Sequence, residues 1–390
     1  MLYTIYQKLK ENIINGGIVA SCDKVYYYHW TRDAALVIQS IHKLYRNKII
    51  DYQEWKKIFI DYYHFENNLD FNHAQGNRGE PKYHIDGSLF HEKWGRPQND
   101  GVALRIITLY QGLELMEEDD YKHYLKKFYC GTFPARNIIK LDLEYLGRHY
   151  LSSYDLWEEV KDINYFNLIC YRKAFECGVE LARINHDYGA SEYYHRKLKK
   201  IKNLLKVFNN DNLIVHLMTD GLDKNNKDNL DVSNMMSVYL YGNLEELENE
   251  LLWKQVYNLL LYFKEKYEIN KDLIYLGRYK NDKYHDGNAW IICTLYFVGF
   301  LVRLKQNWKE IEFNMYMIKI FSLLNYEFNF ENLQKIINRY LNEIYLLGEN
   351  INWSEQINGK DKTGLSVNNL TWNFAVFIDV YLNNNSSNNL

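Results

Sequence analysis

Apolar residues recur at helical spacing along most of the chain. The clearest stretch has apolar side chains at i, i+3, i+4, i+7, i+8 and i+11, which puts them on one face of an amphipathic helix, at Leu333, Ile336, Ile337, Tyr340, Leu341 and Ile344. Similar spacing predicts about a dozen helices, over residues 2–14, 31–47, 51–67, 99–117, 119–148, 163–186, 189–208, 245–267, 287–306, 308–324, 330–348 and 366–382. Alternation typical of a strand is confined to a short segment around Met236 to Tyr241.

The predicted helices belong to one domain, because no linker rich in Pro, Gly or Ser divides the chain. The stretch 209–229, which is rich in Asn, Asp and Lys, is expected to be a polar loop. The sequence shows no repeat of fixed period, which argues against an α-solenoid. We therefore expect a single all-α domain over residues 1–382 and a disordered tail, rich in Asn and Ser, over residues 383–390.

The composition is that of a soluble globular protein, with 47% hydrophobic and 25% charged residues. A net charge of −3 argues against nucleic acid as a main partner, since phosphate binding needs a basic surplus. The longest apolar run, Ala289 to Val302, is shorter than the ~18 residues of a membrane span, so we expect a buried helix and no membrane partner. The N-terminus lacks the basic segment and apolar core of a signal peptide, which favours an intracellular protein.

Aromatic, acidic and arginine residues gather in five segments between predicted helices, at residues 26–33, 79–101, 154–160, 277–290 and 353–372. Loops on a rigid scaffold are where binding and catalytic sites are usually built. Each segment alone also has a structural explanation: a helix cap, a rigid turn, an acidic helix start or a surface carboxylate. Their shared composition is what points to a site.

The first two segments pair an indole with charged groups. Trp30 offers a flat apolar face, and Arg32 and Asp33 offer groups that bind hydroxyls, although Asp33 would also serve as a helix cap. The second segment contains two of the three prolines, which is typical of a shaped loop, and combines Trp94 with Arg96.

The other three segments supply carboxyl groups. Glu158 and Glu159 follow a tryptophan, and like charge and burial favour the protonated form of one carboxyl group in such a cluster, as a general acid requires. Arg278 and Trp290 lie in the fourth segment, where a capped loop would explain neither residue. Glu355 precedes a glycine-containing loop in the fifth.

This composition is typical of proteins that bind sugars. Pyranose rings have apolar faces that pack on aromatic rings and hydroxyl groups that need charged or amide partners. Two separated carboxyl groups are also the minimum equipment for glycoside hydrolysis. No nucleotide, zinc-protease or serine-hydrolase motif is present, and the five cysteines include no CxxC pair. We expect free thiols, no metal and no cofactor.

The segments YxYxWTRD, WGRPQxDG, YDLWEE, GRY…D…GNxW and SEQ…G…LS…LTW resemble, in order and spacing, the catalytic domain of the glucoamylases, glycoside hydrolase family 15. The resemblance runs from residue 26 to residue 372. It implies an (α/α)6 barrel, a six-hairpin toroid with its active site in the loops at one end. It also implies an inverting, exo-acting glycosidase of starch degradation that releases β-D-glucose from α-1,4 and, more slowly, α-1,6 linkages. The substrates would be maltooligosaccharides, soluble starch or glycogen, and we expect a monomer.

The same resemblance assigns roles to individual residues. Glu158 would be the general acid that protonates the leaving oxygen, and Glu355 the general base that activates water from the opposite face. Arg32 and Asp33 would hold the non-reducing glucose. The remaining substrate-binding residues implied are Tyr26, Trp30, Trp94, Glu159, Arg278 and Trp290.

Three alternatives stay open at this point. A trehalase or glucodextranase would share the fold and the chemistry but differ in the subsites for the leaving group. A non-catalytic glucan-binding or regulatory domain would share the scaffold, although it would have no need for both carboxyl groups. An α-helical interaction scaffold would leave the five ordered segments unexplained.

Overall fold

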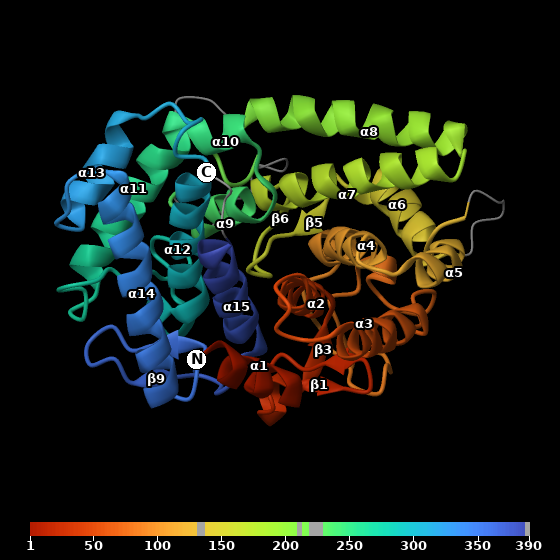
Figure 1. Ribbon diagram of the computed structural model, residues 1–390, viewed down its shortest axis with the longest axis horizontal. Coiled ribbons are helices and arrows are strands. Elements are labelled where there is room, and N and C mark those ends of the chain that lie inside the picture. Colours follow the sequence, from red (N-terminus) through yellow and green to blue (C-terminus); the bar gives the residue numbers. More distant parts are fainter. Residues whose placement is uncertain (131–136, 209–212, 218–228, 387–390) are drawn as a thin grey trace.

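A closed ring of six helices forms the centre of the molecule (Figure 1). The computed structural model describes residues 1–130, 137–208, 213–217 and 229–386. Each helix of the ring packs against the next, and the last packs against the first. In ring order these inner helices are α2 (Thr31–Arg46), α4 (Asn99–Leu113), α7 (Tyr165–Ile184), α9 (Val232–Tyr241), α12 (Ile291–Gln306) and α15 (Thr371–Asn385).

An outer layer of helices surrounds this ring, and one outer helix precedes each inner helix along the chain. The outer helices are α1 (Leu2–Glu11), α3 (Tyr52–Asn67), α6 (Ile138–His149), α8 (Tyr188–Val207), α11 (Glu250–Lys266) and α14 (Phe330–Asn350). They cover the ring: α1 packs on α15, α3 on α2, α6 on α4, α8 on α7, α11 on α9 and α14 on α12. Six successive hairpins therefore build an all-α (α/α)6 toroid, which confirms the expected fold.

Short elements complete the described part of the chain. Three further α-helices belong to neither set of six: α5 (Glu118–Phe128), α10 (Leu244–Glu248) and α13 (Met315–Leu323). All strands are two or three residues long and pair antiparallel. The pairs are β1 (Ile13–Ile14) with β2 (Gly17–Ile18), β3 (Tyr28–Trp30) with β4 (Lys82–His84), β5 (Ser153–Tyr154) with β6 (Lys161–Asp162), and the three-stranded sheet β7 (Ala289–Trp290), β8 (Gln356–Ile357), β9 (Gly364–Leu365).

The buried faces of each helix explain the apolar pattern of its sequence. The outer helix α14 is amphipathic, and the six residues of the apolar stripe beginning at Leu333 are all buried. The inner helix α12 is buried nearly all round, as expected for the longest apolar run, because ring neighbours and an outer helix cover its faces. Cys170, Cys177 and Cys293 are buried free thiols, whereas Cys22 is a free thiol on the surface. No described helix has the length and apolar character needed to cross a membrane.

Several predicted boundaries were wrong. The segment around Met236 to Tyr241 is not a strand but the end of α9, a short inner helix whose all-round burial hides the helical period. The helix predicted over residues 119–148 is two helices, α5 and α6, and that over 245–267 is divided at Asn249, which caps α11. Most of the polar stretch 209–229 lies outside the described residues.

The predicted disordered tail begins too early. Helix α15 continues to Asn385, because tertiary contacts hold its polar last turn. Lys305 donates to the backbone oxygen and the side-chain oxygen of Asn384 at 2.7 and 2.9 Å, and Asn383 donates to the Tyr239 hydroxyl at 2.8 Å. Residues 387–390 lie outside the described residues.

A buried network of ion pairs joins inner and outer helices. Arg105 on α4 is fully buried and donates to Glu66 on α3 at 3.0 Å and to Asp142 on α6 at 2.7 and 2.8 Å. Glu66 also pairs with the ring of His29, at 2.9 Å. This network connects three helices to β3, the strand that leads into the first inner helix.

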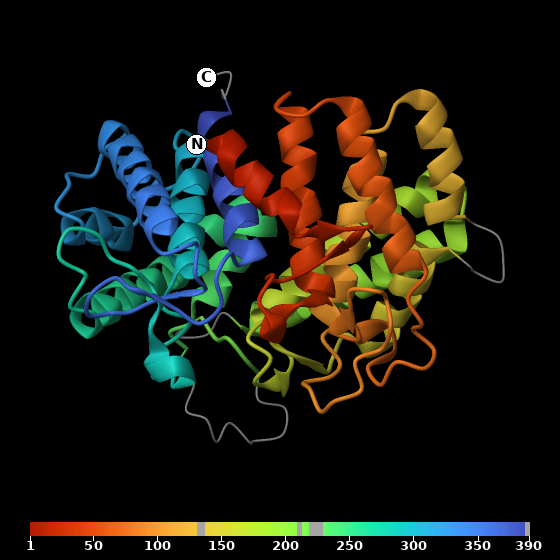
Figure 2. The same ribbon diagram turned by 90° about the horizontal axis from the view of Figure 1, so that it is seen from below.

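The topology determines where the functional segments meet. Because every hairpin runs from an outer helix to an inner one, the loops that precede the inner helices gather at one end of the toroid. Figure 2 shows the described parts of these loops toward the lower side of the molecule, with the C-terminal end of α15 at the opposite edge. The five segments singled out in the sequence all directly precede, or begin, an inner helix.

Candidate active site

A cavity of about 710 Å³ lies among these loops. Its walls combine indole and phenol rings with carboxyl groups and two arginines. The ten residues predicted from the sequence all line it: Tyr26, Trp30, Arg32, Asp33, Trp94, Glu158, Glu159, Arg278, Trp290 and Glu355. The structure therefore brings together residues from five separate segments of the chain.

Glu158 is held by three donors. The indole nitrogens of Trp30 and Trp94 donate to its two carboxylate oxygens at 3.0 and 2.5 Å, one to each oxygen. Arg32 donates to the Trp30-bonded oxygen at 3.0 Å. The backbone of Glu158 has φ of 64°, a left-handed conformation that costs a non-glycine residue free energy. Such strain persists only where the surroundings enforce one geometry, and here it directs the carboxyl group toward the two indoles.

Arg32 and Asp33 line the cavity at the first turn of α2. Arg32 is 5% exposed and donates to Asp33 and Asp100, both at 3.2 Å, and to Gln98 at 3.0 Å. Burial raises the pKa of Asp33 to about 6, although Arg32 opposes the shift, and burial also raises the pKa of Asp100. Asp33 is not the helix cap that the sequence also allowed, because α2 is capped at Trp30 and Asp33 lies buried within its first turn.

Glu355 enters the cavity from the three-stranded sheet and is 2% exposed. Its backbone nitrogen donates to Val367 at 2.9 Å, and the Ser366 hydroxyl donates to a carboxylate oxygen at 2.6 Å. Burial raises the pKa of Glu355, while hydrogen bonds from Ser366, Tyr26 and Gln356 favour the ionised form. The result is a buried carboxyl group whose proton affinity depends on a few identifiable donors.

A second arginine organises the opposite part of the cavity. Arg278 makes two hydrogen bonds to Asp282, at 2.8 and 2.7 Å, and lies 2.8 Å from Glu159. Its guanidinium also lies over the ring of Trp290. The Trp290 indole nitrogen is buried and has no hydrogen-bond partner, so it is a donor available to a ligand.

Two tyrosines meet across the cavity. The hydroxyls of Tyr26 and Tyr284 are 3.1 Å apart. Burial raises the pKa of both phenols, with the charge of Glu355 as the next cause, so both stay neutral donors. Sequence reasoning did not assign Tyr284 to the site, and it lines the cavity beside Tyr26.

Not every charged residue of the five segments belongs to the site. Arg96 donates to Glu80 at 2.6 Å and to two backbone carbonyls of its own loop, so it shapes the loop. Conversely, Trp372 lines the cavity and lies under the Arg32 guanidinium, and sequence reasoning did not single it out. Its signal was its position as the last tryptophan of the fifth segment, at the start of an inner helix.

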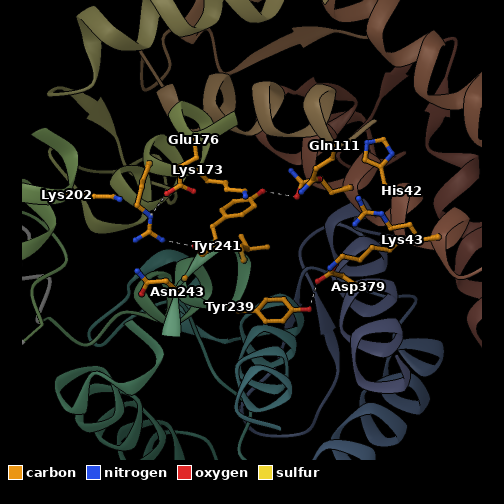
Figure 3. A pocket seen from close by; sticks show the side chains of 15 residues that line it. His42, Lys43, Gln111, Lys173, Glu176, Lys202, Tyr239, Tyr241, Asn243 and Asp379 are labelled. Atoms are coloured by element: carbon orange, nitrogen blue, oxygen red, sulfur yellow. Dashed lines mark hydrogen bonds and ion pairs between the residues drawn. The ribbon is translucent and has the colours of Figure 1, made fainter. Parts of the chain in front are cut away.

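Another hollow, of about 410 Å³, lies toward the C-terminal ends of α2, α4 and α9 (Figure 3). Its lining includes Lys43 and Arg46 in the last turn of α2, where cations complement the helix dipole, together with Arg172, Lys173 and Lys202. Two carboxylates line it: Asp379 is engaged by Lys43 and by the Tyr239 hydroxyl, and Glu176 lies 3.9 Å from Arg172. It therefore lacks a pair of available carboxyl groups. Within the described ranges, no group of three or more His, Cys, Asp or Glu side chains could hold a metal ion.

Comparison with known proteins gives a consistent result. Residues 2–382 match the family model of glycosyl hydrolases family 15. The chain is 28% identical to "Glucoamylase 1" of Rhizopus oryzae over 90% of its own length and 63% of the length of that protein. It is 25% identical to "Probable glucoamylase" of Schizosaccharomyces pombe, over 91% of this chain and 81% of that one.

The solved structures agree on the fold. The glucoamylase of Saccharomycopsis fibuligera superimposes with a TM-score of 0.81 at 22% identity, covering 98% of this chain and 94% of that chain. At that identity the similarity concerns the fold alone. The family model, in contrast, spans almost the entire sequence and includes all five functional segments. The chain belongs to the glycosyl hydrolases of family 15.

Proposed function

We propose that this protein is an inverting, exo-acting glucan 1,4-α-glucosidase. It releases β-D-glucose from the non-reducing ends of α-1,4-linked glucans and maltooligosaccharides, and more slowly from α-1,6 linkages. Glu158 is the general acid and Glu355 the general base. Membership of a glycosyl hydrolase family supports the reaction class, and the arrangement of the cavity supports the finer assignment.

The observation that carries the proposal is two carboxyl groups in one cavity, on loops from opposite sides of the ring. Glu158 belongs to the loop before α7, and Glu355 to the loop before α15. These helices are three places apart in a ring of six, so their loops reach the cavity from opposite directions. Inversion requires this arrangement: an acid at one face of the sugar and a base holding water at the other, with carboxyl groups ~6.5–9.5 Å apart.

The partners of each carboxyl group suit its role. Glu158 gives its proton to the glycosidic oxygen and becomes a carboxylate, and the indole donors of Trp30 and Trp94 with Arg32 stabilise that charge. Glu355 must be ionised to take a proton from water, and Ser366 supports its ionised form.

The charged pair at the start of α2 supports exo action. Arg32 and Asp33 are buried, line the cavity and lie in the first turn of an inner helix, so they are suited to hold the end of a glucan chain. These groups can bind the hydroxyls of a terminal glucose, and the rings of Trp290 and Trp372 offer apolar faces. A terminal sugar unit thus enters while the rest of the chain remains outside.

The test is product analysis with purified protein. Incubation with maltose or maltotriose should release glucose, and proton NMR during the first minutes should detect the β-anomer. Newly formed α-glucose would contradict inversion. Isomaltose and trehalose are assayed in parallel, and cleavage of trehalose alone would replace the proposed specificity with that of a trehalase.

The roles of the two carboxyl groups are tested by Glu158→Gln and Glu355→Gln. Each amide keeps the shape of the side chain but can neither give nor take the proton, so kcat should fall by about 10²–10⁴-fold. Glu192→Gln, on the exposed face of α8, is the matched control and should keep full activity. Near-normal maltose hydrolysis by Glu355→Gln would refute its role as base.

A further inference from the structure

Lys82 is a buried lysine enclosed by four aromatic rings. It lies on β4, directly opposite Trp30 on β3, and is 2% exposed. Its ammonium nitrogen is 3.4 Å from the ring centre of Trp94, 4.0 Å from that of Phe90, 4.5 Å from that of Trp30 and 4.6 Å from that of Tyr28. Lys82 does not line the cavity; it lies behind the two tryptophans that do.

Burying the charged ammonium group of Lys82 costs free energy. Among the described residues, no carboxylate is within ion-pairing distance of the Lys82 ammonium, so the aromatic faces are its main compensation. Burial lowers the pKa of Lys82 to about 8, and the charge of Glu158 is the largest influence opposing that shift. An uncharged side chain such as methionine would fill the same space among aromatic rings without this cost. Packing alone therefore does not explain a lysine here.

Two of the four rings connect Lys82 to Glu158. The indole N–H of Trp30 donates to one carboxylate oxygen of Glu158, and that of Trp94 donates to the other. A cation on the face of an indole draws electron density from the ring, which makes its N–H a stronger donor. Both oxygens of Glu158 therefore receive a hydrogen bond from a ring that Lys82 polarises.

We propose that Lys82 is a positioning residue that stabilises the carboxylate of Glu158 through the indoles of Trp30 and Trp94. The inference rests on the proposed role of Glu158 as general acid. When the Glu158 O–H bond breaks, its proton passes to the glycosidic oxygen and the electron pair stays on the carboxylate. Lys82 keeps its own proton and touches neither the substrate nor the reacting atoms. Its charge acts where negative charge develops, in a site built before the reaction begins.

Other charged groups face the same two side chains. Those around Lys82 are Glu158, Glu92, Arg96 and Glu80. Those around Glu158 include Arg32, Asp33, Asp100 and Tyr284. Arg32 contacts Glu158 directly, and replacing Lys82 does not change that residue. A change seen on replacing Lys82 alone can thus be separated from the direct ion pair.

The experiment compares Lys82→Met with the wild type. The expected result is a kcat for maltose about 10- to 100-fold lower, because a stabilising charge is lost in the transition state. The alkaline limb of the kcat/KM profile should move upward by about 0.5–1 pH unit, since Glu158 loses its proton less readily without the cation. The matched control Lys161→Met removes the same charge from an exposed position on β6 and should change neither quantity.

A double-mutant cycle tests whether the indole carries the effect. If Lys82 acts through Trp94, then Lys82→Met should reduce kcat less in a Trp94→Phe background than in the wild type. Melting temperatures report on folding in each variant. A lowered melting temperature or KM change with an unmoved alkaline limb would show a structural role and overturn the inference.

The same set of variants separates the two proposals. If Glu158→Gln is inactive while Lys82→Met keeps the wild-type kcat and alkaline limb, the inference about Lys82 fails and the proposed function stands. If Glu158→Gln retains activity, the proposed function fails, and with it the role of Lys82.

Discussion

The hydroxyl of Ser366 should control the acidic limb of the pH profile. Ser366 follows β9, donates to Glu355 at 2.6 Å and is exposed, so removing its hydroxyl sacrifices almost no packing. Its backbone φ is 66°, a left-handed conformation that glycine adopts without strain. Ser366→Gly is therefore the cleaner variant, and Ser366→Ala serves as a second one with the same loss of the hydroxyl.

The size of the effect follows from one hydrogen bond. A hydrogen bond to a charged group contributes about 1.5–3 kcal/mol, against about 0.5–1.5 kcal/mol for a neutral one. The ionised form of Glu355 thus loses about 1 kcal/mol more than the protonated form, which corresponds to about 0.7 pH unit. Burial already raises the pKa of Glu355, and loss of the donor raises it further. The base then stays protonated to a higher pH, so the acidic limb moves upward.

The assay is kcat/KM for maltose between pH 3 and pH 9 for the wild type and both variants. Both variants should shift the acidic limb by a similar amount, leave the alkaline limb in place and retain most of the plateau activity. Ser322→Ala, on the exposed face of α13, is the matched control. An unmoved acidic limb, or movement of the alkaline limb instead, would refute Glu355 as the base that Ser366 tunes.

Two further predictions concern stability. The pKa of Asp33 is raised to about 6 in the folded state from 3.8, so the folded protein binds more protons between these values and loses stability as the pH rises through them, by up to about 3 kcal/mol. In urea unfolding, Asp33→Asn should flatten this decline, and an equally steep decline in the variant would contradict the reasoning. Arg105→Met removes the guanidinium that joins the buried Glu66 and Asp142, while His29 and Arg78 still contact them, and it should lower the free energy of unfolding by about 3–5 kcal/mol. The exposed Arg196→Met is its control, and a loss below about 1 kcal/mol would refute the importance of the network.

The local pattern was sufficient for elements whose burial is one-sided. The stripe that begins at Leu333 predicted α14, because an outer helix is covered on one face only and its apolar positions record that face. Where a helix is buried on nearly all faces, as α9 is, the same reasoning wrongly predicted a strand. The ends of helices also depended on partners elsewhere, as the hydrogen bonds of Asn384 to Lys305 demonstrate for α15.

For the site, the sequence by itself determined the chemistry that is available. Carboxyl groups, arginines and indoles in five segments indicated sugar chemistry, and their order indicated the family. Which of these side chains points into the cavity, and which partner each one contacts, depended on contacts between distant segments of the chain. Arg96 and Trp94 are two residues apart, yet one braces a loop and the other binds Glu158.

Only the tertiary structure decided that these segments meet. The ring closes through contacts between α15 and α2, which are more than three hundred residues apart, and this closure brings Glu355 into the cavity that Glu158 lines. The left-handed backbone of Glu158 and the aromatic enclosure of Lys82 arise in the same way. A residue type records which interactions a side chain can make, but a buried charge becomes stable only where the fold supplies its partners, and no local pattern of the chain contains that information.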